Sequence, residues 1–395
     1  MIKNILLKIK NLPVYFIYVF AGFTGVFRYW EWMPIYQYGV VVSFLFASGS
    51  RWYYSKEDIL LLVCFIVLFI SSFISFNDKT INYILAYLYL FFVLYKSVDM
   101  LSRSIALESL LKFNAIGVLV SSFYSCLEFF LKLFLNIEIQ DMLPRVKQAT
   151  ATYMVGIDRS YGFATEPTSL AFYLNILGPF ALIYWRNNLS RLKFLVYTAI
   201  LILGWAFTFS AAAFLFMLLS ICVSLLGYYR LKIVRFIIDY KLGLAIFSGV
   251  IIYLVNSGFL DKIIGKIFLS EEGTSSGQRL MVFELAVGRF LENPLAGIGL
   301  GYTSSVDEMS PMNWYLIILS NGGVFAFMLI FSYMILIMKK AFHITDGFTL
   351  LPAVGILSGV LGFLTTSTFY NPFFWLGIII INKMSHDYAK NIRCI

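Results

Sequence analysis

Charged residues are scarce in this sequence, and histidine and cysteine are scarcer still. Only 13% of the 395 residues are charged, whereas a soluble protein has roughly 25%. The two histidines and four cysteines show neither a disulfide framework nor the spacing of metal ligands. The sequence also lacks a phosphate-binding loop and a soluble basic domain, so neither nucleotide nor nucleic-acid binding is indicated.

Apolar residues fill the chain instead: 60% of the sequence is hydrophobic and 18% is aromatic. A membrane-spanning helix needs about 20 apolar residues, and lipid-exposed backbone must satisfy its own hydrogen bonds. We therefore expect an all-α polytopic membrane protein with about twelve transmembrane helices. The expected spans are 12–27, 35–50, 58–76, 80–95, 105–136, 167–185, 193–208, 211–228, 242–257, 313–338, 349–365 and 372–382. The first is interpreted as a retained span, because no small-x-small cleavage site follows it.

The distribution of basic residues predicts the orientation of these spans. If the N-terminus is cytoplasmic, about two thirds of the 30 lysines and arginines fall on the cytoplasmic side, as the positive-inside rule requires. Both termini are then cytoplasmic, in the inner membrane of a bacterium. The two long connections, 137–166 and 258–312, become periplasmic loops of a single domain that covers residues 1–395.

The first of these loops ends in "DRSYGFATEPTSLAFY", residues 158 to 173. Arg159 and Glu166 stand just before an apolar segment, where charges are costly unless they are solvated, paired or used. Arginine binds phosphate oxygens through two parallel hydrogen bonds, so Arg159 is a candidate for binding an anion. Glu166 has two interpretations of equal weight: a group that accepts a proton, or a structural charge at the start of a helix that begins with Pro167.

The second loop contains "SSGQRLMVFELAVGRFLENPLAGIGLGY". Ser275 and Gln278 form a capping-box pattern, which predicts a helix from near Gly277 to Pro294. Arg279, Glu284 and Arg289 cannot form one charged stripe on that helix, because each interval of five residues turns by about 140°. We favour Arg279 as the residue that faces a site, since the first turn of a helix also attracts anions.

Alternating glycines follow that helix at positions 297, 299 and 301. Glycines at this spacing permit close approach of another chain or a ligand. Taken alone, a glycine-rich turn at the membrane interface is the simpler interpretation.

Together these segments resemble a known family. The pattern "R-x-x-G…E-P" leading into a span, then "R…F…NPLAGIGLG", then "N-W-Y-L…N-G-G" opening the next span is similar to the Wzy-type O-antigen polymerases and the related WaaL-type O-antigen ligases. The motifs are confined to about 158–180 and 276–325. The resemblance places the family's outer-face arginines on Arg159 and Arg279, its glycine turn on Gly297 to Gly301, and a polar position on Asn313.

The resemblance implies a membrane glycosyltransferase of GT-C-like architecture without metal or cofactor. Its substrates would be oligosaccharides linked to undecaprenyl pyrophosphate, and a Wzz-type chain-length regulator would be a partner. Arg159 and Arg279 would stabilise the leaving pyrophosphate, with Glu166 as the third catalytic candidate. The candidates for substrate binding are Arg145, Tyr161, Arg289, Gly297, Gly299, Gly301 and Asn313. Ligases carry a His-Asn pair where this sequence has Met312-Asn313, which favours the polymerase.

A transporter, such as a flippase for lipid-linked oligosaccharides, is the alternative from another class. Transporters place ionisable residues near the middle of the membrane and are built from repeated halves. This sequence shows no such repeat, and Glu128 and Lys132 are isolated candidates within an expected span. Its charges are concentrated in the outer loops, which favours the glycosyltransferase.

The expected topology can be tested by labelling. A cysteine introduced by Ser304→Cys should react with a membrane-impermeant thiol reagent added to the periplasmic side, because the 258–312 loop is expected there. Labelling by a membrane-permeant reagent alone would contradict this topology.

Overall fold

The structure is a computed structural model, and it describes residues 2–26, 34–49, 52–139, 153–154, 157–228, 275–301, 313–344, 350–367, 369 and 371–393. The described residues are almost entirely helical. The helices are α1 (Ile2–Phe20), α2 (Tyr36–Ser48), α3 (Lys56–Ser71), α4 (Thr80–Leu88), the π-helix η1 (Tyr89–Lys96), α5 (Ser97–Ser102), α6 (Leu107–Leu135), α7 (Pro167–Asn188), α8 (Arg191–Ala206), α9 (Ala211–Tyr228), α13 (Ser275–Glu292), α15 (Trp314–His343), α16 (Leu351–Gly362) and α17 (Pro372–Arg393). Two short antiparallel strands, β1 (Tyr153–Met154) and β2 (Ile157–Asp158), precede α7.

The expected all-α fold is confirmed. Among the described residues, four helical segments are long and apolar enough to cross a membrane: Thr80–Ser102, in which α4, η1 and α5 are continuous, and α6, α7 and α15. Each expected span overlaps an observed helix except 242–257, which lies outside the described residues. The helix expected after the Ser275 capping box is also present, as α13.

Three helices continue well beyond the expected spans. The span expected at 80–95 continues to Ser102, the span expected at 313–338 continues to His343, and the span expected at 372–382 continues to Arg393. At the first of these ends Lys96 is buried with two aspartates as partners, so the helix continues through it.

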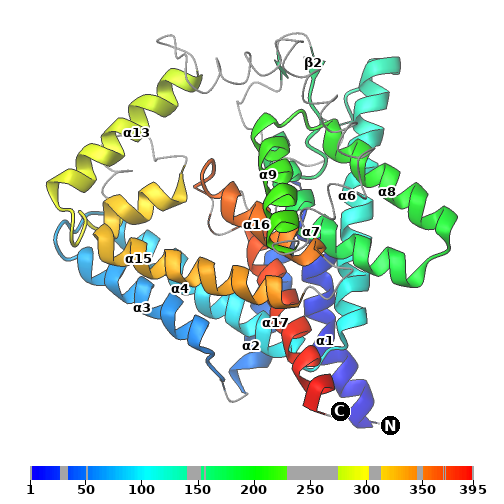
Figure 1. Ribbon diagram of the computed structural model, residues 1–395, viewed down its shortest axis with the longest axis horizontal. Helices are drawn as coiled ribbons and strands as arrows, with labels where there is room; N and C mark the ends of the chain where they lie inside the picture. The colour runs from blue at the N-terminus through cyan, green and yellow to red at the C-terminus, as the bar shows by residue number, and fades with distance from the viewer. Residues whose placement is uncertain are drawn as a thin grey trace.

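Both chain termini lie at the same end of the molecule (Figure 1). The strand β2 lies at the opposite end, and so does one end of α13. The membrane side of each end stays a prediction.

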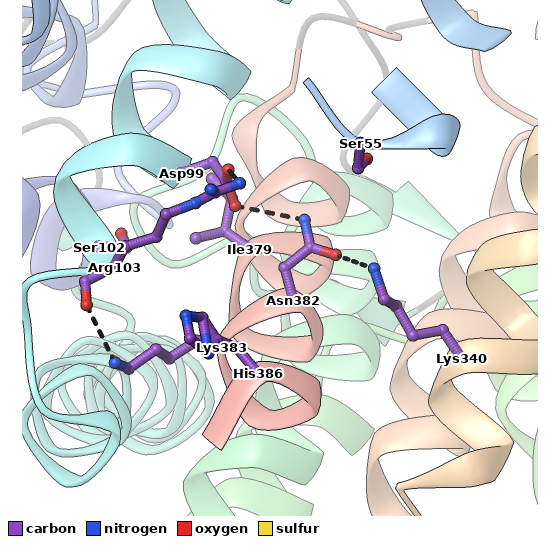
Figure 2. Close-up of a pocket in the computed structure, with 9 residues that line it drawn as sticks. All are labelled: Ser55, Asp99, Ser102, Arg103, Lys340, Ile379, Asn382, Lys383 and His386. Carbon is purple, nitrogen blue, oxygen red and sulfur yellow. Dashed lines mark hydrogen bonds and ion pairs between the residues drawn. The ribbon is translucent and has the colours of Figure 1, made fainter. Parts of the chain in front are cut away.

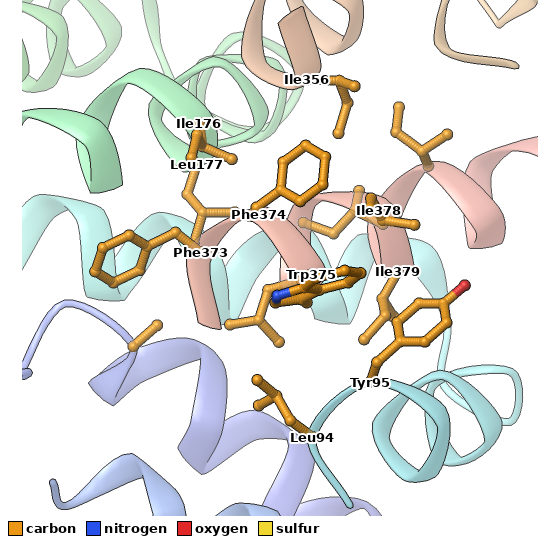
Figure 3. Packing of buried hydrophobic residues seen from close by; sticks show 14 of the residues in the cluster. Leu94, Tyr95, Ile176, Leu177, Ile356, Phe373, Phe374, Trp375, Ile378 and Ile379 are labelled. Atoms are coloured by element: carbon orange, nitrogen blue, oxygen red, sulfur yellow. The ribbon is translucent and has the colours of Figure 1, made fainter. Parts of the chain in front are cut away.

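Helix α7 occupies the centre of the bundle. Of its apolar stretch, 83% is buried, and a helix that is apolar on all sides is stable only when it is surrounded. Figure 3 shows Ile176 and Leu177 of α7 facing Phe373, Phe374 and other α17 side chains. This packed centre provides a rigid support for the loop that leads into α7.

Candidate functional site

The loop at residues 159–166 leads from β2 into α7. The side chain of Glu128, on α6, forms hydrogen bonds with this loop. The Glu128 carboxylate is only 2% exposed. It lies 2.8 Å from the Ser160 hydroxyl and accepts a hydrogen bond from the backbone N–H of Gly162 at 2.7 Å. A buried carboxylate is costly unless it is hydrogen-bonded, so these contacts stabilise both the carboxylate and the loop.

Arg159 begins this loop and contacts the turn between α8 and α9. Its Nε donates to the backbone oxygen of Thr208 at 3.0 Å, and the N–H of Ser160 donates to the oxygen of Phe207 at 2.9 Å. In the same turn Phe209 has a φ of +45°, a conformation that is strained for a bulky residue. The loop and the turn therefore hold the start of the Arg159 side chain in one place.

The charge of Arg159 is affected by two opposing influences. Partial burial lowers the pKa of its guanidinium from the ordinary value, and the nearby carboxylate of Glu166 raises it. Arginine in proteins stays protonated in spite of such shifts. The Glu166 carboxylate is therefore near enough to influence the charge of Arg159. A shared catalytic site stays a prediction.

Glu166 is the residue immediately before the first turn of α7. Its backbone is extended there, with Pro167 as the first helical residue. One carboxylate oxygen accepts a hydrogen bond from the Ser169 hydroxyl at 3.3 Å. This position agrees with the structural interpretation of Glu166, in which a negative charge stabilises a helix N-terminus. Its role as a base stays a prediction.

For two of the other candidate arginines, a position next to Arg159 stays a prediction. Arg145 lies outside the described residues. Arg279 lies in the first turns of α13, but its side chain is outside the described part. Arg289, also on α13, forms an ion pair with Glu292 at 2.8 Å, and 53% of the Glu292 side chain is exposed. Such an i,i+3 pair on one helix is typical of a solvated surface.

The glycine turn at residues 293–301 supplies hydrogen-bond donors at a break in α15. Gly323 has non-helical backbone angles inside that helix, with φ at +65°. The backbone oxygens of Ser320 and Asn321 therefore lose their helical partners, and they accept hydrogen bonds from the N–H groups of Ile298 and Gly299, both at 2.9 Å. Unpaired backbone groups are costly inside apolar surroundings, so the break and the turn depend on each other.

The far side of the turn is bound to the connection between α3 and α4. The N–H of Leu300 donates to the Ser72 hydroxyl at 3.0 Å, and the Thr80 hydroxyl donates to the oxygen of Leu300 at 2.9 Å. At Gly299 an added Cβ would come within 2.9 Å of the Cα of Ser72, and at Gly301 within 2.9 Å of the Thr80 nitrogen. The glycines thus permit close packing of protein against protein. Substrate binding by them stays a prediction.

Asn313 and Tyr161 have structural contacts in the protein. The Asn313 side chain accepts a hydrogen bond from the N–H of Leu316 at 3.2 Å, which makes it the N-cap of α15. Tyr161 lies half-buried on the 159–166 loop, and its backbone oxygen accepts from the N–H of Ala164 at 2.9 Å. Neither contact tests a role in substrate binding.

Sequence reasoning missed a buried cluster of charges near the ends of α3 and α5. Lys96 is 0% exposed; it forms ion pairs with Asp58 of α3 and, at 3.6 Å, with Asp99. Asp99 is also 3.0 Å from Arg103. We had expected Lys96 in a cytoplasmic connection. The spacing of Lys96, Asp99 and Arg103 was the available signal, because residues at i, i+3 and i+7 share one helical face.

Comparison with known proteins leaves the resemblance untested. No model of a known protein family matches the chain, and no curated protein matches it. The resemblance to O-antigen polymerases therefore rests on the short motifs around Arg159 and the 293–301 turn. Within the described ranges, no three His, Cys, Asp or Glu side chains lie close enough together to hold a metal ion.

Replacing Glu128 tests its function as the support of the 159–166 loop. Glu128→Ala removes the acceptor of the Gly162 N–H, and a buried unsatisfied group costs about 1–3 kcal/mol; the Ser160 hydroxyl keeps Ser125 as a partner. Thermal unfolding in detergent should show a clear loss of stability, whereas Glu128→Gln, which keeps an acceptor oxygen, should lose less. The control is Glu108→Ala, an exposed position on the same helix. Equal unfolding temperatures for the two alanine variants would show that Glu128 does not support the loop.

The glycine turn can be tested with a matched pair of substitutions. In Gly297→Ala the new Cβ would overlap the backbone of Asn321, and the φ of +72° disfavours any side chain, at a cost of about 1–2 kcal/mol for the backbone alone. Gly288→Ala on α13 meets no atom within 4 Å and should be neutral or stabilising by up to about 1 kcal/mol. The yield of monodisperse protein and its unfolding temperature measure both effects. The expectation fails if Gly297→Ala matches the unsubstituted protein.

Proposed function

We propose that this protein is an O-antigen polymerase of the bacterial inner membrane, with about twelve spans in a GT-C-like architecture. It transfers the growing glycan from undecaprenyl pyrophosphate onto the non-reducing end of an incoming lipid-linked repeat unit, at the periplasmic face. The observation that carries the proposal is the position of Arg159. This residue is half-buried in the loop that leads from β2 into the central helix α7, and β2 lies at the end of the bundle opposite the termini (Figure 1).

The proposed reaction breaks the bond between the anomeric carbon of the growing glycan and the pyrophosphate oxygen. An acceptor hydroxyl forms the new glycosidic bond, and the undecaprenyl pyrophosphate leaves with the electron pair. The hydroxyl proton passes to a base, for which Glu166 is the candidate. Negative charge builds on the leaving group as the bond breaks, and a fixed cation at that position stabilises the transition state more than the ground state.

The geometry of Arg159 suits this task. Its Nε is committed to the carbonyl oxygen of Thr208, which fixes one edge of the planar guanidinium. The two terminal nitrogens are then the groups that would contact the pyrophosphate. Because Glu128 and the Phe207 carbonyl hold the adjoining loop, little reorganisation would be needed during the reaction.

Arg159→Lys tests the proposal. A lysine keeps the charge but loses the planar fork and the contact to Thr208, so it should not restore function. Loss of a contact made chiefly to the leaving group should cost about 2–4 kcal/mol of transition-state stabilisation, or roughly 30- to 1000-fold in rate. Arg279→Lys should behave in the same way if both arginines grip one pyrophosphate. The measurement is the glycan ladder of complemented cells, normalised to the amount of protein.

Two controls accompany this test. Arg191→Lys changes an exposed arginine on α8 and should leave the ladder unchanged. Thermal unfolding of Arg159→Lys separates a failure of catalysis from a failure to fold. Ladders of normal length from both the Arg159 and the Arg279 variants would show that these residues are solvated loop charges.

One observation favours the flippase as a second candidate. Lys96, Asp58 and Asp99 form a buried ion cluster inside the bundle, and ionisable residues within membrane segments often mark transport pathways. The two candidates differ in their requirements. A polymerase extends a lipid-linked glycan in detergent, where no gradient exists, whereas a flippase only moves such a substrate across intact vesicles.

A further inference from the structure

A polar cavity lies between the ends of α5, α15 and α17, near the chain termini. Its volume is about 140 Å³, several times the share of about 30 Å³ that a water molecule occupies in the liquid. Figure 2 shows Asn382 and Lys383 of α17 facing Asp99 and Arg103 of α5 on one side and Lys340 of α15 on the other. No residue of the 159–166 loop lines the cavity, whereas Asp99 of the buried ion cluster does.

Three of the charged groups that line this cavity are cationic: Arg103, Lys340 and Lys383. The imidazole of His386 lies beside them, and Asp99 is the one carboxylate among the lining residues. Asp99 is paired with Arg103 at 3.0 Å and with the buried Lys96 at 3.6 Å. An anion placed in the cavity would therefore meet chiefly the two lysines and a guanidinium whose charge Asp99 partly offsets.

Two lysines of the wall have carboxylate partners outside the cavity. Lys340 is 3.4 Å from Glu57, and Lys383 is 3.3 Å from Asp387. These distances exceed the 2.7–2.9 Å of a strong charge-assisted hydrogen bond. Lys340 also donates to the side-chain oxygen of Asn382 at 2.9 Å, and Lys383 donates to the backbone oxygen of Arg103 at 3.1 Å. Because each ammonium has three donors, both lysines keep a donor for an anion.

Ser102 supplies an independent observation. Its side chain is 1% exposed and lines the cavity, and its hydroxyl oxygen has no hydrogen-bond partner in the protein. A buried hydroxyl without a partner is costly, and native proteins rarely leave one. An oxyanion in the cavity would accept the hydrogen bond that this hydroxyl is able to donate.

We propose that this cavity binds a phosphate-type oxyanion through Lys340, Lys383, Arg103 and Ser102. The phosphate comes either from a phospholipid headgroup of the adjoining leaflet or from free phosphate in solution. Basic pockets between the ends of membrane helices are suited to lipid phosphates on the cytoplasmic side, which is where the basic residues of this chain predict the termini to be. The proposal does not depend on the function of the 159–166 loop.

The test is the thermal unfolding of delipidated, full-length protein in detergent. One arm adds inorganic phosphate against chloride at equal ionic strength. The other arm adds short-chain phosphatidylglycerol against phosphatidylcholine. Because a ligand that binds only the folded state stabilises it, we expect a saturable rise in unfolding temperature of roughly 2–4 °C per kcal/mol of binding linkage. A rise with phosphate identifies the soluble ligand, and a rise with phosphatidylglycerol alone identifies the headgroup.

Variants then locate the site. The double variant Lys340→Gln/Lys383→Gln should weaken binding at least tenfold, while Lys193→Gln, an exposed lysine on α8, should leave it unchanged. Ser102→Ala should weaken binding several-fold without lowering the stability of the ligand-free protein, since its hydroxyl has no partner to lose. If the double variant does not fold, the comparison of Ser102→Ala with the unsubstituted protein tests the proposal. The absence of any ligand-dependent shift, or the same shift in the Ser102 variant and the unsubstituted protein, would overturn the proposal.

Discussion

Inside a bundle of apolar helices, every polar group needs a partner from the protein itself, and the arrangement of this molecule follows from that constraint. The Glu128 carboxylate is stabilised because the 159–166 loop brings it a hydroxyl and an N–H. The broken backbone of α15 is stabilised because the 293–301 turn supplies its missing donors. Lys96 is tolerated because two aspartates surround it. In each of these three cases, a buried polar group is paired with a partner from another segment of the protein.

The positions of the helices could be predicted because apolar run length is a local property of the sequence. Helix α13 could be predicted equally well, since a capping pattern at Ser275 marks its start and Pro294 follows its end. Helix ends that depend on distant partners could not be predicted from the sequence. Lys96 resembles a solvated charge in the sequence, and its main partner, Asp58, lies on another helix. The sequence therefore predicted a helix end where ion pairs allow the helix to continue.

For the candidate site, the sequence indicated some of the residues but not their contacts. Charges next to an apolar segment pointed to Arg159 and Glu166, and alternating glycines indicated a close approach of backbone. The sequence could not show what each group contacts, because the hydrogen bonds of Arg159 to Thr208 and of the glycine turn to Ser320 join residues that are far apart in the chain. The capping contact of Asn313 is local.

The break at Gly323 also solves a problem of length. An uninterrupted helix from Trp314 to His343 would be about 45 Å long at 1.5 Å per residue, well beyond the roughly 30 Å of a bilayer's hydrocarbon core. The portion that follows the break, from Val324 to His343, is about 30 Å long by the same rise per residue. It matches the hydrocarbon thickness unaided. The short portion before the break therefore does not need to span the membrane. Its direction can be set by contacts with the glycine turn and the first helices instead of by the lipid.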